Sequence, residues 1–272
     1  MGTEAFSFEP EMTELRTDSD RRAALADARV LVVGLGALGC PAAWHLAAAG
    51  VGVLVLIDPD RVDLSNLHRQ LLHRSRDIGS LKVDSAAAHL RERFPAVRLE
   101  THALALTDAN GPQLMRAVDF VVDATDGVAA KFLVNDCAVR CGRPFSHAGI
   151  LGFLGQTLTV LPGHSACYRC LFPEPPPSDE VPSCQEAGVV GGIAGVIGAM
   201  QAAEAIKHLT GAGPLSADCL VTYDALTDRW RRVRVKRNPR CPVCAQAPAD
   251  VAAAGAAAPA SLDATVRPRY GE

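Results

Sequence analysis

The sequence contains no uninterrupted apolar run long enough to span a lipid bilayer. Its most apolar candidate, residues 188–206, is rich in glycine and alanine and is bounded by Glu204 and Lys207. The first 14 residues include four glutamates and lack the basic and apolar regions of a signal peptide. We therefore expect no membrane-spanning segment and no secretory leader.

The sequence also lacks a surplus of positive charge. It has 27 Lys and Arg against 30 Asp and Glu, giving a net charge of −3, and we do not expect the basic residues to gather in one tract. Nucleic acid is therefore not an expected partner. Aromatic residues make up only 5% of the chain, but hydrophobic residues make up 49%, enough for a substantial core. The cysteines number nine, an odd count, and some have metal-ligand spacing, which favours a reducing compartment such as the cytoplasm.

Two Cys-x-x-Cys pairs, Cys167/Cys170 and Cys241/Cys244, are the most informative feature that is present. Each pair can bring two thiolates to one metal ion, and two pairs complete a tetrahedral four-thiolate zinc site. Four protein ligands leave no open position, so the predicted zinc is structural. The alternative is two redox-active or free cysteine pairs.

Short apolar runs alternate with helical patterns along the first half of the chain. Strands are expected at 29–33, 51–57, 97–104, 120–122 and 144–148, and helices at 40–49, 82–94 and 129–140. This alternation predicts an α/β, Rossmann-like, doubly wound and mainly parallel sheet. After residue 149 we expect antiparallel strands at 153–161, 220–224 and 230–235, and a Gly/Ala-rich helix at 189–209.

We divide the chain into three parts. Residues 1–20 are expected to form an arm or a short helix, and residues 246–272 a disordered Ala/Pro-rich tail. Between them, residues 21–245 form one domain, with a nucleotide-binding half at 21–150 and a second half at 151–245 that contains the cysteine pairs.

A G-x-G-x-x-G pattern, formed by Gly34, Gly36 and Gly39, lies between the first expected strand and helix. Such a turn lets backbone amides approach a phosphate at a helix N-terminus. Asp58 follows about 20 positions later and is suited to hold a ribose hydroxyl. This geometry serves NAD and ATP equally well.

The polar segment 58–70 favours ATP over NAD. A nicotinamide needs an apolar slot, whereas a triphosphate needs cations and amides. Arg69 and Lys82 can neutralise phosphates, Asn66 can donate hydrogen bonds to them, and Asp126 can hold magnesium at a strand end. The alternative is a solvated loop with ordinary capping and surface residues.

Taken together, these motifs resemble the MoeB/ThiF/HesA family, relatives of ubiquitin-activating enzymes. The resemblance runs from about residue 28 to residue 244. Its matching segments are 34–41, 58–70, 79–82, 123–126, 167–173, 183–189 and 241–244.

The family adenylates the C-terminal glycine of a small ubiquitin-like sulfur carrier and releases pyrophosphate. The resemblance implies an adenylyltransferase that uses ATP and magnesium, acts on such a carrier and forms a homodimer. It assigns the ribose to Asp58, the phosphates to Asn66, Arg69 and Lys82, and magnesium to Asp126; Ser65 belongs to the same nucleotide-binding string.

The sequence departs from the family pattern at two places. Gly127 replaces the asparagine that usually follows the magnesium-binding aspartate. The family's N-terminal arginine segment is not recognisable, which leaves Arg16, Arg21 and Arg22 as alternatives.

Cys184 matches a cysteine that in some relatives attacks the acyl adenylate or becomes linked to the carrier. We count it among the candidate catalytic residues, together with Arg69, Lys82 and Asp126. The alternative is a buried cysteine without a catalytic role.

The preferred function is ATP-dependent adenylation of a sulfur carrier, for sulfur transfer into a cofactor or metabolite. The chain ends soon after the second cysteine pair, so we expect a separate sulfur donor, such as a cysteine desulfurase or a sulfurtransferase. Two alternatives remain open: an NAD-dependent oxidoreductase, and a catalytically degenerate scaffold that binds a carrier or peptide.

Overall fold

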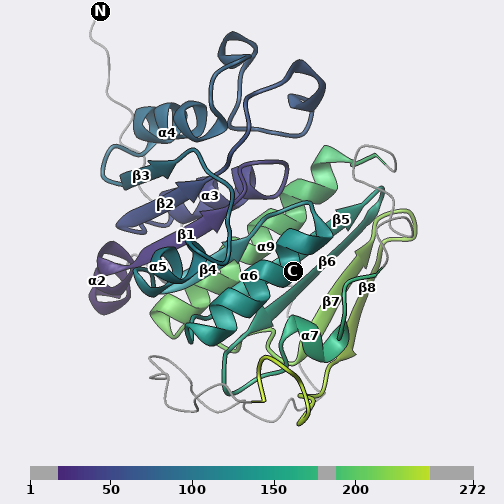
Figure 1. Ribbon diagram of the computed structural model, residues 1–272. Helices are drawn as coiled ribbons and strands as arrows, with labels where there is room; N and C mark the ends of the chain where they lie inside the picture. The colour runs from purple at the N-terminus through teal and green to yellow at the C-terminus, as the bar shows by residue number, and fades with distance from the viewer. Residues whose placement is uncertain (1–17, 177–187, 246–272) are drawn as a thin grey trace, which may run out of the picture.

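The computed structural model describes residues 18–176 and 188–245. One sheet of eight strands runs through it in the order β3-β2-β1-β4-β5-β6-β7-β8, a twisted layer that can be followed in Figure 1. The strands from β3 to β5 pair in parallel, and those from β5 to β8 pair antiparallel. The predicted α/β fold, a parallel sheet with an antiparallel continuation, is confirmed.

The predicted elements of the parallel half are all present, with small shifts at their ends. The strands are β1 (Arg29–Val33), β2 (Val53–Ile57), β3 (Arg98–His102), β4 (Phe120–Asp123), β5 (Phe145–Leu151), β6 (Leu154–Val160), β7 (Cys219–Asp224) and β8 (Arg229–Arg234). The helices are α2 (Ser19–Asp27), α3 (Gly39–Ala48), α4 (Lys82–Arg93), α5 (Gly111–Arg116), α6 (Val128–Arg140), α7 (Tyr168–Leu171) and α9 (Gly191–Thr210). The helices α2, α5 and α7 were not predicted, and α5 and α7 are so short that they carry little helical periodicity.

Apolar residues cover both faces of the central strands because helices pack on both faces. Alternate residues of β1 enter different cores: Val30 and Val32 lie in one, Leu31 and Val33 in the other. The first core includes side chains of α3, α4 and α9, and the second includes those of α5, α6 and the cysteine pairs. This double covering explains why these strands read as continuous apolar runs.

The small residues of α9 allow close packing within the subunit. A Cβ atom added at Gly198 would lie 2.4 Å from the carbonyl oxygen of Leu38, just before α3. A Cβ at Gly155 on β6 would likewise lie 2.5 Å from Ile197 of α9. The Gly/Ala-rich composition of this helix is therefore used against α3 and the sheet.

The expectation that basic residues form no tract is wrong for the last strand. All six residues of β8, at the edge of the sheet, are exposed, and four of them are arginines: Arg229, Arg231, Arg232 and Arg234. Charged side chains are a common protection for an exposed sheet edge against unwanted strand pairing.

Among the described residues, no helix is both long and apolar enough to cross a lipid bilayer.

Candidate active site and metal centre

The glycine-rich turn lies at the carboxyl end of β1, and two of its three glycines are required by packing. Gly34 has a φ of +94°, and a Cβ there would lie 2.8 Å from the carbonyl oxygen of Ala124. A Cβ at Gly39 would lie 1.9 Å from the carbonyl oxygen of Gly34. At Gly36 the nearest atom is Nε2 of Gln70, at 3.8 Å. Gly36 therefore leaves open the space that a bound phosphate would need.

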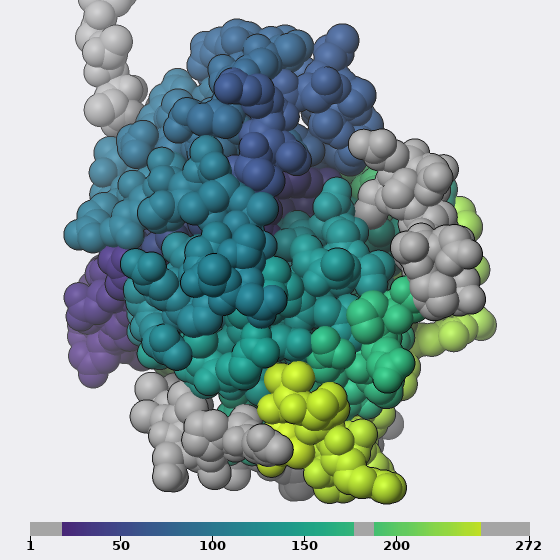
Figure 2. Space-filling model, in the orientation of Figure 1, coloured from purple at the N-terminus to yellow at the C-terminus, as the bar shows by residue number. Residues whose placement is uncertain are grey.

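The N-terminus of α3 faces this turn without a side-chain cap. Uncapped helix N-termini carry free amide hydrogens and a partial positive charge, both of which suit phosphate oxygens. Beside it, Gln70 is buried and its Oε1 atom has no hydrogen-bond partner among the described residues. In Figure 2 a recess opens between the blue and the teal parts of the surface, with purple N-terminal atoms at its floor. The glycine-rich turn is thus suited to bind the phosphates of a nucleotide.

Asp58 joins the end of β2 to the glycine-rich turn. Its Oδ2 accepts a hydrogen bond from the backbone N–H of Leu35 at 2.7 Å, and its Oδ1 accepts one from the N–H of Asp60 at 2.8 Å. Burial raises the pKa of this carboxyl, although Lys82 and the two backbone hydrogen bonds act against that rise. Each carboxylate oxygen retains a lone pair, so Asp58 can still accept hydrogen bonds from ribose hydroxyls.

Lys82 is the first residue of α4 and is buried, only 6% exposed. Its Nζ atom lies 2.8 Å from Oδ2 of Asp60 and 3.9 Å from Oδ1 of Asp58. The structure thus brings Lys82 and Asp58 together, as the sequence predicted for a shared site. It also adds Asp60, which was not among the predicted site residues although the Asp-x-Asp spacing contained it.

Three further predicted residues lie on the loop after β2. Arg69 donates a hydrogen bond from Nη2 to Oδ1 of Asn66 at 2.5 Å, and Ser65 donates from Oγ to Oδ1 of Asp63 at 2.5 Å. The loop is held by the start of α9, because a Cβ on Gly191 would lie 2.9 Å from the carbonyl oxygen of His68. Asn66 and Arg69 are half-buried and Ser65 is exposed, so a ligand can reach all three.

Asp126 follows the carboxyl end of β4 and is exposed. Its alternative role, capping the next helix, is not seen: the N-cap of α6 is Gly127, and no side chain accepts the cap hydrogen bonds. The contact between Gly34 and Ala124 places this segment beside the glycine-rich turn. An exposed carboxylate at this position suits magnesium, which keeps several of its water ligands.

Cys184 and Arg16 lie outside the described residues. Arg21 is on α2, where its Nε atom lies 3.1 Å from Oδ2 of Asp18.

The four cysteines of the two pairs meet at one point, although 74 positions separate Cys167 from Cys241. Their four Sγ atoms all lie within 4.8 Å of one another. Individual distances are 3.9 Å for Cys167–Cys170, 3.6 Å for Cys167–Cys241 and 3.3 Å for Cys170–Cys244. Tetrahedral zinc with Zn–S bonds of about 2.3 Å requires sulfur atoms about 3.8 Å apart, so the set fits zinc.

The surroundings of the sulfur atoms also favour a metal. Burial raises the pKa of Cys167, and its three cysteine neighbours raise it further. Four thiolates can share this space only if a cation offsets their charge. In addition, the backbone N–H of Asn238 donates a hydrogen bond to Sγ of Cys170 at 3.3 Å. Such a hydrogen bond, from a group that does not itself contact the metal, orients the ligand sulfur.

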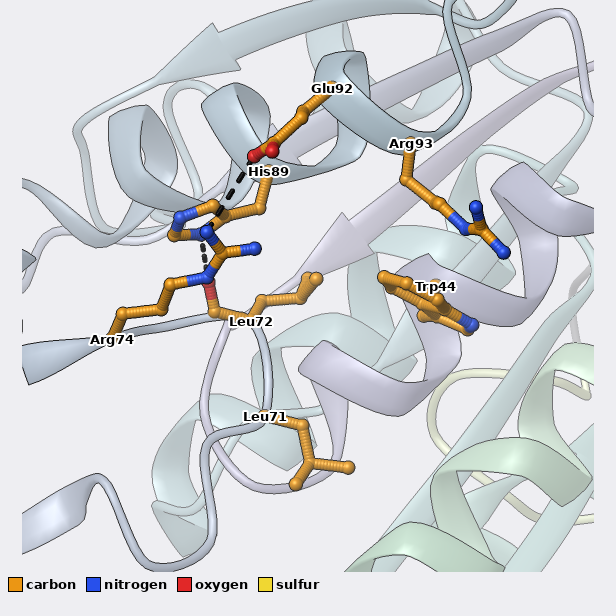
Figure 3. Close-up of a pocket in the computed structure, with 7 residues that line it drawn as sticks. All are labelled: Trp44, Leu71, Leu72, Arg74, His89, Glu92 and Arg93. Carbon is orange, nitrogen blue, oxygen red and sulfur yellow. Dashed lines mark hydrogen bonds and ion pairs between the residues drawn. The ribbon is translucent and has the colours of Figure 1, made fainter. Parts of the chain in front are cut away.

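A separate pocket of about 240 Å³ lies between α3, α4 and residues 71–74, which precede the short helix η2 (Ser75–Asp77) (Figure 3). Its lining residues are Trp44, Leu71, Leu72, Arg74, His89, Glu92 and Arg93. None of these was predicted for the nucleotide site. Arg74 pairs with Glu92 at 3.7 Å, and His89 bonds the carbonyl oxygen of Leu72 at 2.5 Å, so these polar groups already have partners. The glycine-rich turn therefore remains the candidate active site.

Comparison with known proteins decides the family. A model described as the ThiF family matches residues 11–243. The chain belongs to the ThiF family. The resemblance inferred from the sequence motifs is therefore confirmed.

Within the ThiF family, the chain is 46% identical over 229 residues to the sulfur carrier protein adenylyltransferase of Thermus thermophilus, a match that covers 82% of the chain and 84% of that relative. It is also 46% identical over 225 residues to the adenylyltransferase and sulfurtransferase MOCS3 of Sus scrofa, covering 82% of the chain but 50% of that longer relative. Among solved structures, E. coli MccB with ATP superposes with a TM-score of 0.72 at 24% identity, covering 82% of this chain and 68% of that one. This last likeness supports the fold alone.

Proposed function

We propose that this protein is an ATP-dependent adenylyltransferase that acts on the C-terminal glycine carboxylate of a ubiquitin-like sulfur carrier. The observation that carries the proposal is the convergence of an open glycine turn, the Asp58–Lys82 pair and the Asp126 segment at the carboxyl ends of neighbouring parallel strands. The 46% identity to a sulfur carrier protein adenylyltransferase supports the choice of substrate.

The reaction joins a carrier carboxylate oxygen to the α-phosphorus of ATP and breaks the bond to pyrophosphate. Two anions must approach each other, so the protein's task is to supply positive charge and fixed geometry. In this proposal Lys82 and Arg69 offset phosphate charge, and Asn66 donates hydrogen bonds to phosphate oxygens. Asp58 orients the ribose, and Ser65 lies on the same loop as Asn66 and Arg69 and contributes to nucleotide binding. No general base is needed, because the attacking carboxylate is already ionised at neutral pH.

We assign magnesium to Asp126 and zinc to the four cysteines. Magnesium bound at Asp126 would neutralise phosphate charge and fix its position. The zinc would be structural, holding the segment after β6 against the segment after β8 through Cys167, Cys170, Cys241 and Cys244.

The remaining partners follow from the same proposal. We propose a homodimer, a separate sulfur donor such as a cysteine desulfurase or sulfurtransferase, and a cytoplasmic location, where the thiol ligands stay reduced. Cys184 is proposed as a candidate for covalent chemistry with the carrier.

ATP–pyrophosphate exchange tests the function. Purified protein is mixed with ATP, magnesium, labelled pyrophosphate and candidate carriers that end in Gly-Gly. We expect label to enter ATP only when the carrier tail is intact, and a carrier lacking its final glycine to give none. An NAD-dependent oxidoreductase would show nicotinamide turnover and no exchange. A scaffold would bind the carrier without any exchange, and either result would overturn the proposal.

A further inference from the structure

Three ionisable or polar side chains lie buried directly behind the Asp126 segment. Asp123, at the end of β4, is 0% exposed; His147 on β5 is 1% exposed; and Lys131 on α6 is 8% exposed. None of them was predicted as a site residue, although Asp123 begins the matching segment 123–126, and none belongs to the proposed set of nucleotide contacts. Charged groups are seldom fully buried unless they are paired, so this cluster requires an explanation.

Asp123 fixes the backbone that leads to Asp126. Its Oδ1 atom accepts hydrogen bonds from the backbone N–H of Thr125 at 3.2 Å and from the Thr125 hydroxyl at 2.7 Å. Its Oδ2 atom accepts a hydrogen bond from Nδ1 of His147 at 2.8 Å. The carboxylate is thus a link between the strand β5 and the residue immediately before Asp126.

Lys131 holds the same segment from the helix side. Its Nζ atom donates to the carbonyl oxygens of Thr125 and Ala148, each at 2.5 Å. Across the sheet, Nε2 of Gln201 donates to the carbonyl oxygen of Asp123 at 2.8 Å. The segment is therefore secured by β5, α6 and α9 at once.

The charges are matched so that Asp123 stays ionised. Burial acts to raise its pKa, but Lys131 and the hydrogen bond from His147 outweigh it and hold that pKa at about 2. Burial lowers the pKa of His147, which is consistent with a neutral ring that donates through Nδ1. Its Nε2 atom then has no hydrogen-bond partner among the described residues, and the ring of Tyr168 lies beside it at a centroid distance of 4.3 Å, tilted by 40°.

Stability alone does not explain such a network, because apolar residues of similar size can often replace buried ion pairs without loss. What the polar network adds is a fixed direction for Thr125 and hence for Asp126. Resting on the adenylation function above, we propose that His147 and Lys131 are positioning residues that hold the Thr125–Asp126 segment in the geometry required for a magnesium–nucleotide complex.

The test compares His147→Leu, which removes the donor to Asp123, with His147→Asn, whose amide nitrogen can occupy the position of Nδ1. Thr159→Val is the matched control, because Thr159 is also buried on the sheet and donates to Glu204 at 2.6 Å, in a separate hydrogen-bonded pair. Each variant is measured in ATP–pyrophosphate exchange over a range of magnesium concentrations, and its unfolding is measured in urea.

We expect His147→Leu to lower kcat by roughly 10- to 100-fold, as for other residues that orient a metal ligand from outside its shell. The magnesium concentration for half-maximal rate should rise, KM for ATP should change little, and His147→Asn should recover most of the activity. A kcat and magnesium dependence equal to those of Thr159→Val would overturn the proposal, since His147 would then only stabilise the fold.

A second measurement is independent of turnover. Hydrogen exchange of the Thr125 amide reports its bond to Asp123, and we expect faster exchange in His147→Leu than in the wild type and in Thr159→Val. Unchanged exchange would contradict the positioning role. If the wild type shows no pyrophosphate exchange with any carrier, the proposed function fails, whereas faster Thr125 exchange would still support the positioning of the segment.

A milder variant keeps the test available if His147→Leu does not fold. Thr125→Val removes one hydroxyl from a half-buried residue and deletes one of the bonds to Asp123. We expect a smaller shift in the same direction, with a higher magnesium requirement and a KM for ATP near that of the wild type. An unchanged magnesium requirement in this variant would count against the proposal.

Discussion

The three glycines of the nucleotide turn should respond differently to the same substitution. A Cβ at Gly36 would have its nearest neighbour 3.8 Å away, an ordinary contact, and Gly36 does not have a positive φ. A Cβ at Gly39 would lie 1.9 Å from the carbonyl oxygen of Gly34, a separation that no rotation of a side chain can relieve. Gly36→Ala should therefore impair binding, whereas Gly39→Ala should impair folding.

The expected magnitudes follow from these distances. Gly36→Ala should leave the free energy of unfolding within about 1 kcal/mol of the wild type, because a compatible Gly→Ala change acts mainly through the unfolded chain. Its methyl group would occupy the space proposed for a phosphate, and loss of one hydrogen bond to that charged group, about 1.5–3 kcal/mol, corresponds to about 10- to 100-fold weaker ATP binding. Gly39→Ala requires a backbone shift, for which about 1–3 kcal/mol of destabilisation, or more, is expected.

Urea unfolding and calorimetric titration with ATP measure the two effects separately. Gly195→Ala is the matched control, because Gly195 lies within α9 and no atom lies within 4 Å of its would-be Cβ. It should stabilise the protein by about 1 kcal/mol through helix propensity, with unchanged ATP affinity. The steric reasoning is refuted if Gly36→Ala binds ATP as the wild type does, or if Gly39→Ala is as stable as Gly36→Ala.

Three further predictions concern charges and metal. Cys241→Ser should lower the zinc content from about one ion per chain and should lower the Tm, because metal binding and folding are coupled. Metal analysis and thermal unfolding measure the two effects. A wild type that is stable without metal would contradict the prediction. Arg69→Ala and Lys82→Met should each reduce the rate of ATP–pyrophosphate exchange by roughly 100-fold. Only Lys82→Met should also lower the stability of the fold, because Lys82 is buried beside Asp58. Equal urea midpoints for the two variants would contradict this difference. The pKa of Asp123 is depressed to about 2 in the fold, so its stabilising contribution is complete above its unfolded pKa near 4 and is lost as pH falls towards 2. Asp123→Asn should remove that part of the acid dependence, and urea unfolding at pH 2–5 with an unaltered slope would argue against it.

Several site residues were predictable because their chemistry is local in sequence. The Cys-x-x-Cys pairs, the glycine pattern after an apolar strand, and Asp58 at the next strand end each combine a residue type with a short spacing. The structure places the cysteines around one point and puts Asp58 on the N–H of Leu35, within the glycine-rich turn. These features follow from strand and turn geometry, which neighbouring residues largely decide.

Other site residues carried no local signal. His147 lies in an apolar strand, where a single histidine is most simply a core residue, and Lys131 reads as a helix residue of no special kind. Their proposed roles depend on Asp123, which is 24 positions from His147 and enters the same cluster only because β4 and β5 are neighbours. Asp60 was overlooked for the same reason, since its contact with Lys82 spans 22 positions.

The sequence by itself determined the fold class, the order of the main strands and helices, the two cysteine pairs proposed to bind a metal, and the family. The fold class and the cysteine pairs depend on periodicity and spacing along the chain, and the family depends on the resemblance of its motifs. The tertiary structure decided which glycine leaves space for a ligand, that Lys82 is buried against two carboxylates, and that a charged network stands behind Asp126. Those properties depend on contacts between distant segments, and the free energy of a buried charge or a close backbone contact is set by such three-dimensional neighbours.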